Sequence, residues 1–394
     1  MTRTVDAVVV GGGPSGATAA HELARRGRSV LLLDRAGRIK PCGGAIPPRL
    51  IQDFGIPDRL LCARITSARM VSPSSRGVDM PVGDGFVGMV NRDVFDEWLR
   101  ERAAGCGAER IAGRFLSVGR DPDGTAVVSF QRNGVAKSEA PEQVRARVVI
   151  GADGAISAVA EQCIPGADRI RHVFAYHEII RAPAEGFDGQ RCDVYYQGKL
   201  SPDFYGWVFP HGDTASVGSG SARKGFSLRK SVGDLRAAAG LTDAETIRRE
   251  GAPIPMKPLR RWDNGRDVVL AGDAAGVVAP ASGEGIYYAM EGGRLAGDAA
   301  DLFLTTGDAK ALRTARRRFM RAHGTVFRIL GIMQWFWYSS DKRRERFVSI
   351  CADPDVQRLT WDSYMNKKLT RKDPMAHVRI FLKDVAHLLG LVSA

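Results

Sequence analysis

Near the start of the chain, two short apolar runs flank a segment with helical character. The runs lie at 6–10 (DAVVV) and 29–34 (SVLLLD), and the segment at 17–27 reads ATAAHELARRG. Short apolar runs bounded by glycines are typical of buried strands. The order strand, glycine turn, helix, strand predicts a βαβ unit.

Apolar and polar residues alternate through the middle of the chain, with turn residues between the alternating segments. This pattern predicts a largely antiparallel sheet. The alternating segments lie at 126–134, 146–154, 171–180, 192–200, 205–212 and 214–220.

Helical spacing appears at 90–107, and an α/β pattern returns after the alternating region. The segment 267–273 (DVVLAGD) predicts a strand that leads into a helix from about 283 to 304, and the remaining chain has helical character. The expected apolar side of the first of these helices consists of Val90, Val94, Trp98 and Leu99.

The glycine turn of the βαβ unit carries the first candidate chemistry. Gly11, Gly13 and Gly16 form GxGxxG between a strand and a helix, and Asp34 closes the next strand about twenty residues later. Such glycines permit a tight turn and close approach of a pyrophosphate, while the acid binds the adenosine ribose. A dinucleotide site is favoured over a chance glycine turn, and the neighbouring residues expected to join it are Ser15 and Arg35.

A second candidate site lies far downstream, in VVLAGDAAGVVAPASGEGIYYAMEGG. Asp273 ends a strand, and Gly283, Gly285 and Ile286 open a helix. The acid is placed to bind a sugar-like hydroxyl, and the positive end of the helix would stabilise an anionic reduced flavin. A plain Asp cap would explain Asp273 but not the glycines. This second site favours FAD over a nicotinamide dinucleotide as the bound cofactor.

Composition changes this picture little. The 394 residues are 44% hydrophobic and 26% charged, which excludes a disordered chain and a protein with many membrane spans. The six cysteines form no CxxC pair, so no metal site and no disulfide framework is expected. The N-terminal apolar run is a strand rather than a signal peptide, which predicts a cytoplasmic protein.

The order of the motifs resembles that of the para-hydroxybenzoate-hydroxylase-like flavoproteins. The resemblance rests on the glycine turn, the helix after Val90, GADG with Asp153 and Gly154, and GDAAG. It implies that Arg92 contacts the FAD and that the GADG loop supports it. The arginine usual after that loop is absent from ISAVAEQC, which weakens the interpretation as an aromatic hydroxylase or other FAD monooxygenase.

Two further stretches resemble the geranylgeranyl reductases. SPDFYGWVFP matches their PxxYxWxFP signature, and KPCGGAIPPRL is similar to the cysteine loop of the branch that acts on chlorophyll and bacteriochlorophyll. Tyr205, Trp207 and Phe209 alternate and would project to one face. In isolation they could be sheet core or the wall of an apolar channel, and the resemblance favours a channel for a polyprenyl chain.

The resemblance implies stepwise reduction of isolated isoprenoid double bonds, with NADPH or ferredoxin as reductant. The expected substrate is geranylgeranyl diphosphate or a geranylgeranyl-bearing pigment, and the alternative is a polyprenyl lipid of the archaeal type. Cys42 is a proton donor, a residue packed on the flavin face, or a small apolar turn residue. Gly43 and Gly44 would let its loop pass close to the flavin.

The positive charge of the chain is concentrated at its end. The net charge is +13, and residues 306–394 hold 18 Lys and Arg against eight Asp and Glu. The apolar run at 328–340 is too short to span a bilayer, so Trp335 to Tyr338 and the basic DKRRER segment predict peripheral contact with an anionic photosynthetic membrane. Packing in a buried helix is the alternative. The pigment esterification enzyme is a further candidate partner, and nucleic acid is not expected.

The expected fold class is α/β, with an FAD-binding Rossmann-like domain interwoven with an antiparallel-sheet substrate domain and a C-terminal helical region. The expected FAD-binding segments are 1–60, 85–165 and 262–305. The substrate-binding segments are 61–84 and 166–261, and the basic helical region is 306–394.

Overall fold

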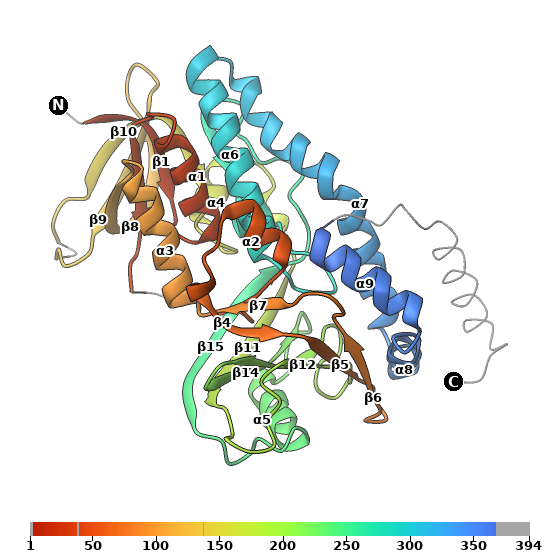
Figure 1. The fold of residues 1–394 in the computed structure, drawn as a ribbon. Coiled ribbons are helices and arrows are strands. Elements are labelled where there is room, and N and C mark those ends of the chain that lie inside the picture. Colours follow the sequence, from red (N-terminus) through yellow and green to blue (C-terminus); the bar gives the residue numbers. More distant parts are fainter. Residues whose placement is uncertain (1–2, 38, 137, 368–394) are drawn as a thin grey trace. The chain divides into compact units, whose positions relative to one another are not determined.

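The computed structural model describes residues 3–37, 39–136 and 138–367, and the chain forms two compact units (Figure 1). The first unit comprises Met1–Lys40, Arg92–His172 and Pro253–Phe327, and the second comprises Pro41–Asn91, Val173–Ala252 and the chain from Arg328. Each unit is therefore built from three separate segments. The division differs from the expected segments in three respects. Residues 41–60 and 85–91 belong to the second unit, and residues 166–172 and 253–261 belong to the first. The expected separate region that starts at residue 306 is instead divided between the two units after Phe327.

The first unit contains a six-stranded sheet whose parallel strands have a Rossmann-like order. β8, β2, β1, β10 and β16 are parallel neighbours, and β9 pairs antiparallel with β8 and β10. The central strands are apolar and buried on both faces, as the short apolar runs predicted. The strands are β1 (Thr4–Val10), β2 (Val30–Asp34), β8 (Glu109–Arg120), β9 (Ala126–Arg132), β10 (Glu142–Gly151) and β16 (Val268–Leu270).

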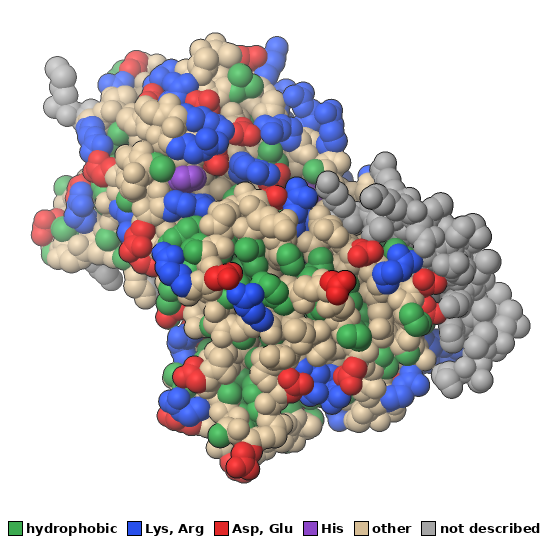
Figure 2. Space-filling view, viewed as in Figure 1, with side chains coloured by type: hydrophobic (Ala, Val, Ile, Leu, Met, Phe, Trp, Pro, Cys, Tyr) green, Lys and Arg blue, Asp and Glu red, His purple; other side chains and the backbone are tan. Residues whose placement is uncertain are grey.

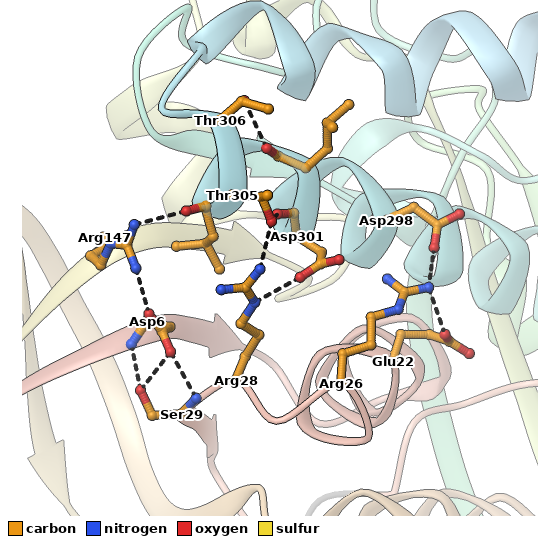
Figure 3. Close-up of polar contacts among 12 residues, drawn as sticks. Asp6, Glu22, Arg26, Arg28, Ser29, Arg147, Asp298, Asp301, Thr305 and Thr306 are labelled. Carbon is orange, nitrogen blue, oxygen red and sulfur yellow. Dashed lines mark hydrogen bonds and ion pairs between the residues drawn. The ribbon is translucent and has the colours of Figure 1, made fainter.

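Two helices of this unit, α1 (Pro14–Ala24) and α6 (Ile286–Thr306), pack closely together (Figure 1). A Cβ on Gly293 would lie 2.1 Å from the Ser15 carbonyl oxygen, so the backbones approach as only glycine allows. Near the other end of α1, Arg26 pairs with Asp298 at 2.5 Å, and Arg28 pairs with Asp301 at 2.7 Å (Figure 3). These contacts hold α6 against α1 at both ends of α1.

Helix α3 (Arg92–Gly105) confirms the predicted helix but buries a different face. Val94 is 53% exposed, and Val90 belongs to strand β7 (Val87–Val90). The buried positions repeat at three- and four-residue intervals, which is the spacing of one helical face. Leu99 is buried as expected, but the rest of the expected apolar side was wrong, because the buried face includes an ion pair. The members of the buried face are Arg92, Phe95, Asp96, Leu99 and Ala103.

The second unit is organised around a seven-stranded sheet in the order β15-β11-β14-β13-β12-β5-β6. All pairings with a described register are antiparallel except the parallel pair of β12 and β5, so a largely antiparallel sheet is confirmed for the segments between 171 and 220. The expected segments 126–134 and 146–154 were wrongly assigned to it, because they form β9 and β10 of the first unit, where β10 runs parallel to β1 and β16. The strands are β15 (Thr246–Pro255), β11 (His172–Arg181), β14 (Thr214–Ser221), β13 (Gly206–His211), β12 (Arg191–Tyr195), β5 (Ser67–Val71) and β6 (Gly77–Pro81).

Helix α5 (Leu228–Ala238) covers one face of this sheet. Val208, Val217, Val232 and Leu235 form its core there. The rest of the unit is a small sheet and further helices, namely β3 (Ala45–Ile46), β4 (Leu61–Ile65), β7 (Val87–Val90), α2 (Pro48–Phe54), α8 (Asp341–Ile350) and α9 (Pro354–Asn366).

The chain after α6 is helical as far as the structure describes it. Helix α7 (Arg313–Trp337) begins in the first unit and ends in the second. Over the described residues, every helix is too short or too polar to cross a membrane.

Candidate active site

Four parallel strands of the first unit end in residues that the sequence singled out. β1 leads into the glycine turn, β2 ends at Asp34, β10 leads into the loop of Asp153, and β16 leads into the turn of Asp273. The carboxyl ends of parallel strands lie at one edge of a sheet. The strand order reverses between β1 and β10, which is where open α/β sheets bind their ligands.

Two glycines of the turn are required by the fold itself. Gly11 has φ +104°, and a Cβ there would lie 2.3 Å from the Ala152 carbonyl oxygen. A Cβ on Gly16 would lie 1.8 Å from the Gly11 carbonyl oxygen. Gly13 differs, because it has φ −73° and no atom of the described residues lies within 4 Å of the place that a Cβ would take. The space beside Gly13 is therefore open to a ligand.

The first turn of α1 has the donors that a pyrophosphate needs. The Ser15 hydroxyl is buried and has no hydrogen-bond partner among the described residues. Among the described residues, helix α1 has no side-chain cap and no acidic residue in its first turn. The first N–H groups of a helix have no partner within the helix, so they are available to a ligand. An open space, an unpaired hydroxyl and a helix N-terminus together fit the pyrophosphate of a dinucleotide such as FAD.

The adenosine end of this site includes an arginine that the sequence did not single out. Asp34 accepts the Arg35 backbone N–H at 2.8 Å, while the Arg35 side chain is exposed. Arg100 Nη1 lies 3.2 Å from both Asp34 Oδ2 and the Gly12 carbonyl oxygen. Arg100 thus joins the glycine turn to the ribose-binding acid. It lies two helical turns after Arg92, and only the fold brings it to Asp34.

Arg92, the expected cofactor contact, forms a buried ion pair within α3. Its Nε and Nη2 lie 2.8 and 2.7 Å from the two carboxylate oxygens of Asp96. The pair adds two charge-assisted hydrogen bonds at the start of α3. Contact of Arg92 with FAD stays a prediction.

Asp153 of the GADG loop caps the next helix, α4 (Ala158–Cys163). It accepts the Ser157 hydroxyl at 2.5 Å and the Val159 N–H at 3.2 Å. Burial raises the pKa of Asp153, and these hydrogen bonds oppose the rise. Gly154 has φ +92°, which lets the loop turn after Asp153. The loop also touches the glycine turn, since Ala152 lies against Gly11.

The downstream acid is paired with a lysine from the end of the first segment. Lys40 Nζ donates to Asp273 Oδ2, and Asp273 is 9% exposed. The sequence did not single out Lys40, which lies two residues before Cys42. A carboxylate held by a lysine still has lone pairs for a ribityl hydroxyl.

The start of α6 has the predicted glycines and an additional acid. Gly285 is the N-cap and precedes Ile286, Gly283 has φ +64°, and the Glu284 carboxylate accepts the Tyr287 N–H at 2.9 Å. Glu284 is buried near the helix end, where an acidic side chain opposes the helix dipole. It therefore offsets part of the positive potential expected there.

In the second unit, the predicted aromatic residues form a continuous row. The ring centroids of Tyr205 and Trp207 are 6.0 Å apart, and those of Trp207 and Phe209 are 6.3 Å apart. Burial, aided by nearby Tyr196 and Cys42, raises the pKa of Tyr205 well above its usual range. The phenol is therefore protonated at neutral pH.

The Cys42 loop lies against this row. The Cys42 sulfur accepts the Gly44 N–H at 3.4 Å. A Cβ on Gly43 would lie 3.1 Å from the Phe209 ring, and one on Gly44, with φ +73°, would lie 2.5 Å from His211 Cε1. The glycines therefore make room for Phe209 and His211. Passage of the loop close to a flavin stays a prediction.

His211 contacts the Cys42 loop at Gly43. Its Nε2 lies 3.1 Å from the Gly43 carbonyl oxygen, and its Nδ1 lies 3.1 Å from Asn91 Oδ1 and 3.5 Å from the Cys62 sulfur. Burial lowers the pKa of His211 to about 4, against a smaller opposing effect of the Gly43 hydrogen bond. The imidazole is therefore neutral, and its one N–H donates either to the Gly43 carbonyl oxygen or to Asn91 Oδ1.

This neutral histidine predicts acid-sensitive stability. Between pH 6.5 and about 4 the unfolded chain binds a proton at His211 that the folded chain does not bind, so stability falls as the pH falls. The loss amounts to about 3 kcal/mol across the window. Chemical denaturation of the wild type and of His211→Gln from pH 4 to pH 7 checks this. The variant should lose less stability on acidification, and an equal loss in both proteins would contradict the assignment.

Comparison with known proteins agrees with a dinucleotide site in the first unit. Residues 4–177 match the FAD binding domain family. The chain is 60% identical over 389 residues to geranylgeranyl diphosphate reductase of Rhodobacter capsulatus, with 98% of each protein covered. It is 34% identical to geranylgeranyl diphosphate reductase of Synechocystis sp., with 97% of each covered.

Two more distant proteins extend the comparison. The chain is 30% identical to digeranylgeranylglycerophospholipid reductase of Methanocaldococcus jannaschii, with 82% of the chain and 84% of that protein covered. A crystal structure of a geranylgeranyl bacteriochlorophyll reductase-like protein from Thermoplasma acidophilum has the same fold, with a TM-score of 0.81, 22% identity and 95% and 99% of the two chains covered. With an FAD-type glycine turn and likeness along nearly its whole length, the chain belongs to the geranylgeranyl diphosphate reductase family.

Proposed function

We propose that the chain is an FAD-dependent geranylgeranyl diphosphate reductase of (bacterio)chlorophyll biosynthesis. It reduces isolated double bonds of the geranylgeranyl group stepwise to the phytyl form. The 60% identity to the Rhodobacter capsulatus enzyme over 98% of both proteins carries this proposal. The fit of the glycine turn, Ser15 and Asp34 to a dinucleotide supports it.

The first unit would hold FAD along the carboxyl ends of its strands. Ser15 and the first turn of α1 would bind the pyrophosphate, and Asp34 the adenosine ribose. Asp273, held by Lys40, would accept a ribityl hydroxyl. FAD would supply hydride from its reduced ring. The protein itself would supply the binding site for the isoprenoid and the proton that the reduction needs.

A proton is needed because an isolated double bond has no neighbouring group that withdraws electrons. Hydride addition at one carbon must be accompanied by protonation of the other. We infer that the Cys42 thiol donates this proton. Its sulfur accepts the Gly44 N–H, and the described residues provide no acceptor for its S–H. The Gly44 N–H would stabilise the thiolate that remains, and solvent would restore the proton.

The aromatic row is proposed as the wall of the substrate channel. Tyr205 and Trp207 are almost fully buried, and Phe209 is partly buried beside the Cys42 loop. A polyprenyl chain offers no polar group for recognition, so an apolar wall suits it. Ring faces would also stabilise the positive charge that develops on the neighbouring carbon, which receives the hydride.

NADPH is proposed as the reductant and would bind only transiently, because only the GxGxxG of Gly11 to Gly16 joins a strand to a helix. The second match, Gly83 to Gly88, joins strand β6 to strand β7. The test uses purified enzyme with NADPH and either geranylgeranyl diphosphate or geranylgeranyl-bacteriochlorophyll, followed by mass analysis. Successive gains of two hydrogens identify the substrate. Reduction only with ferredoxin would refute NADPH, and hydrogenation of digeranylgeranyl lipids in preference to both would favour the archaeal type of substrate. A hydroxylated product would indicate a monooxygenase.

A peripheral membrane contact is proposed for the second unit. Ile329, Ile332 and Trp335 recur at three-residue intervals on α7 and are 40%, 65% and 75% exposed. The expectation that all four aromatics at 335–338 face outward was wrong, because Trp337 and Tyr338 are buried. Basic and acidic side chains are interspersed on the face in Figure 2. The exposed stripe on α7, rather than the basic tail as a whole, therefore marks the proposed contact.

Replacing this stripe is predicted to weaken membrane binding. Ile332→Ser with Trp335→Ser removes apolar surface that would enter the headgroup region. We expect at least about a tenfold loss of binding to phosphatidylglycerol vesicles in a flotation assay, with unchanged FAD content. Val94→Ser, at an exposed apolar site of α3, is the control. Equal binding of all three proteins would refute the contact. The same vesicles loaded with the pigment esterification enzyme would show whether that enzyme is a partner.

A further inference from the structure

A buried hydrogen-bond chain crosses four neighbouring strands of the seven-stranded sheet. Glu250 of β15, His177 of β11, Ser216 of β14 and Trp207 of β13 follow one another across the sheet. Glu250 Oε2 lies 3.0 Å from His177 Nε2, His177 Nδ1 lies 2.8 Å from Ser216 Oγ, and Ser216 Oγ lies 3.1 Å from Trp207 Nε1.

The chemistry of the groups gives this chain one direction. The indole N–H can only donate, so the Ser216 oxygen accepts from Trp207. The Glu250 carboxylate can only accept, so His177 Nε2–H donates to it, and in the neutral imidazole Nδ1 accepts from the Ser216 hydroxyl. Burial opposes ionisation of Glu250, but His177 and Arg248 hold the pKa of Glu250 below its usual value. The chain therefore ends on a carboxylate.

A proton relay to the substrate is excluded by the same chemistry. The indole N–H neither releases nor accepts a proton near neutral pH, so the chain stops at Trp207. The hydrogen-bond chain can therefore act only by controlling the orientation of the Trp207 indole. An indole whose N–H is held by a buried hydroxyl has one favoured rotamer, whereas an unheld indole leaves the hydroxyl unsatisfied.

Gly218 is a second, independent feature that fixes the same ring. In the sheet register Gly218 lies between His177 and Trp207, opposite both. A Cβ there would lie 2.2 Å from Trp207 Cζ2 and 2.6 Å from the Cβ of His177. The indole thus lies over a position of β14 that has no side chain. A side chain at position 218 would displace the ring from this orientation.

We propose that Ser216, His177 and Glu250 are positioning residues that hold Trp207 and thereby set how the geranylgeranyl chain is seated for successive reductions. This rests on the proposed role of Trp207 in the channel wall. If the indole rotates, the geranylgeranyl chain binds less tightly and dissociates before all of its double bonds have been reduced. Loss of Ser216 therefore raises KM and increases the share of partly reduced products, while FAD binding is unaffected.

The test is a double-mutant cycle with Ser216→Ala and Trp207→Phe in the full-length, FAD-loaded enzyme. Ser216→Ala is expected to raise the KM for geranylgeranyl diphosphate about tenfold in the wild-type background. In the Trp207→Phe background it should change neither KM nor the product distribution, because the indole it acts through is gone. Ser216→Ala effects of equal size in both backgrounds would overturn the proposal.

Ser219→Ala is the matched control. Ser219 lies on the same strand and is equally buried, but its hydroxyl donates to the Leu200 carbonyl oxygen at 2.6 Å. It should leave KM and the products unchanged even where it lowers thermal stability. A KM effect in Ser219→Ala as large as that in Ser216→Ala would mean that any buried serine of β14 acts in this way, which contradicts the proposal.

A spectroscopic measurement separates this proposal from the proposed function. The ultraviolet resonance Raman difference between the wild type and Trp207→Phe isolates the indole N–H band of Trp207. Ser216→Ala should shift that band toward a weaker hydrogen bond, whatever substrate the enzyme accepts. An unshifted band overturns the hydrogen-bond chain. A shifted band in an enzyme that does not reduce geranylgeranyl diphosphate refutes the proposed function instead, and with it the seating role.

Discussion

Gly13→Ala is expected to abolish FAD binding without destabilising the folded chain. The φ of Gly13 is −73°, which alanine adopts readily, and no atom of the described part of the chain lies within 4 Å of the Cβ that would be added. The protein therefore has room for the methyl group. The pyrophosphate would occupy that same room, so FAD affinity should fall by at least about 100-fold.

The measurement is flavin absorbance per protein after gel filtration, with the melting temperature of the apoprotein alongside. Gly105→Ala is the control, since Gly105 at the end of α3 also has open space at its Cβ position. We expect full FAD content in that variant. If Gly13→Ala retained FAD, the pyrophosphate would not lie on the glycine turn. If it lost FAD only by unfolding, the steric argument would be wrong.

Cys42→Ala is expected to lower turnover by about 100-fold with normal FAD content, which is the usual effect of removing a general acid. The variant keeps the loop, because Gly43 and Gly44 shape it through Phe209 and His211. Reduction of the flavin by NADPH should be unchanged, so the loss should appear only in the step that consumes geranylgeranyl diphosphate.

Cys62→Ala is the matched control for this experiment. Cys62 is a partly buried thiol of the same unit whose Sγ donates to the Met89 carbonyl oxygen at 3.3 Å, and it should keep most of the activity. Products formed in deuterium oxide should hold one solvent deuterium for each bond reduced. Unchanged turnover in Cys42→Ala, or product without solvent deuterium, would remove the thiol from the reaction.

Local pattern was sufficient to predict much of the fold. The runs DAVVV and SVLLLD became β1 and β2, and the glycine motif has the geometry that its spacing implies, with positive φ at Gly11 and close backbone approach at Gly16. These features depend on neighbours in sequence. The apolar face of α3 was predicted wrongly because Arg92 and Asp96 are buried as a pair, which hydrophobicity alone does not indicate.

The candidate site was predictable only where a motif carries it. Arg100 reaches Asp34, and Lys40 reaches Asp273, from positions far apart in the sequence. His211 follows the aromatic signature directly, yet its role depends on burial and on the Gly43 carbonyl oxygen. Such contacts arise from tertiary structure, and no local spacing encodes them.

The same limit applies to the aromatic residues. The sequence placed Tyr205, Trp207 and Phe209 on one face, and the structure has their rings in one row. The sequence did not indicate that the Trp207 indole donates a hydrogen bond to Ser216, because Ser216 belongs to the next strand and looks like an ordinary polar position. Trp335 and Trp337 also look alike in sequence, but one is exposed and the other is buried.

The most direct test of the account is a single turnover without excess reductant. The purified enzyme is reduced stoichiometrically under anaerobic conditions and then mixed with geranylgeranyl diphosphate. We predict that the absorption band of oxidised flavin returns and that one dihydro product forms for each flavin. A purified protein with no flavin band, or a reduced flavin that geranylgeranyl diphosphate does not oxidise, would contradict the account.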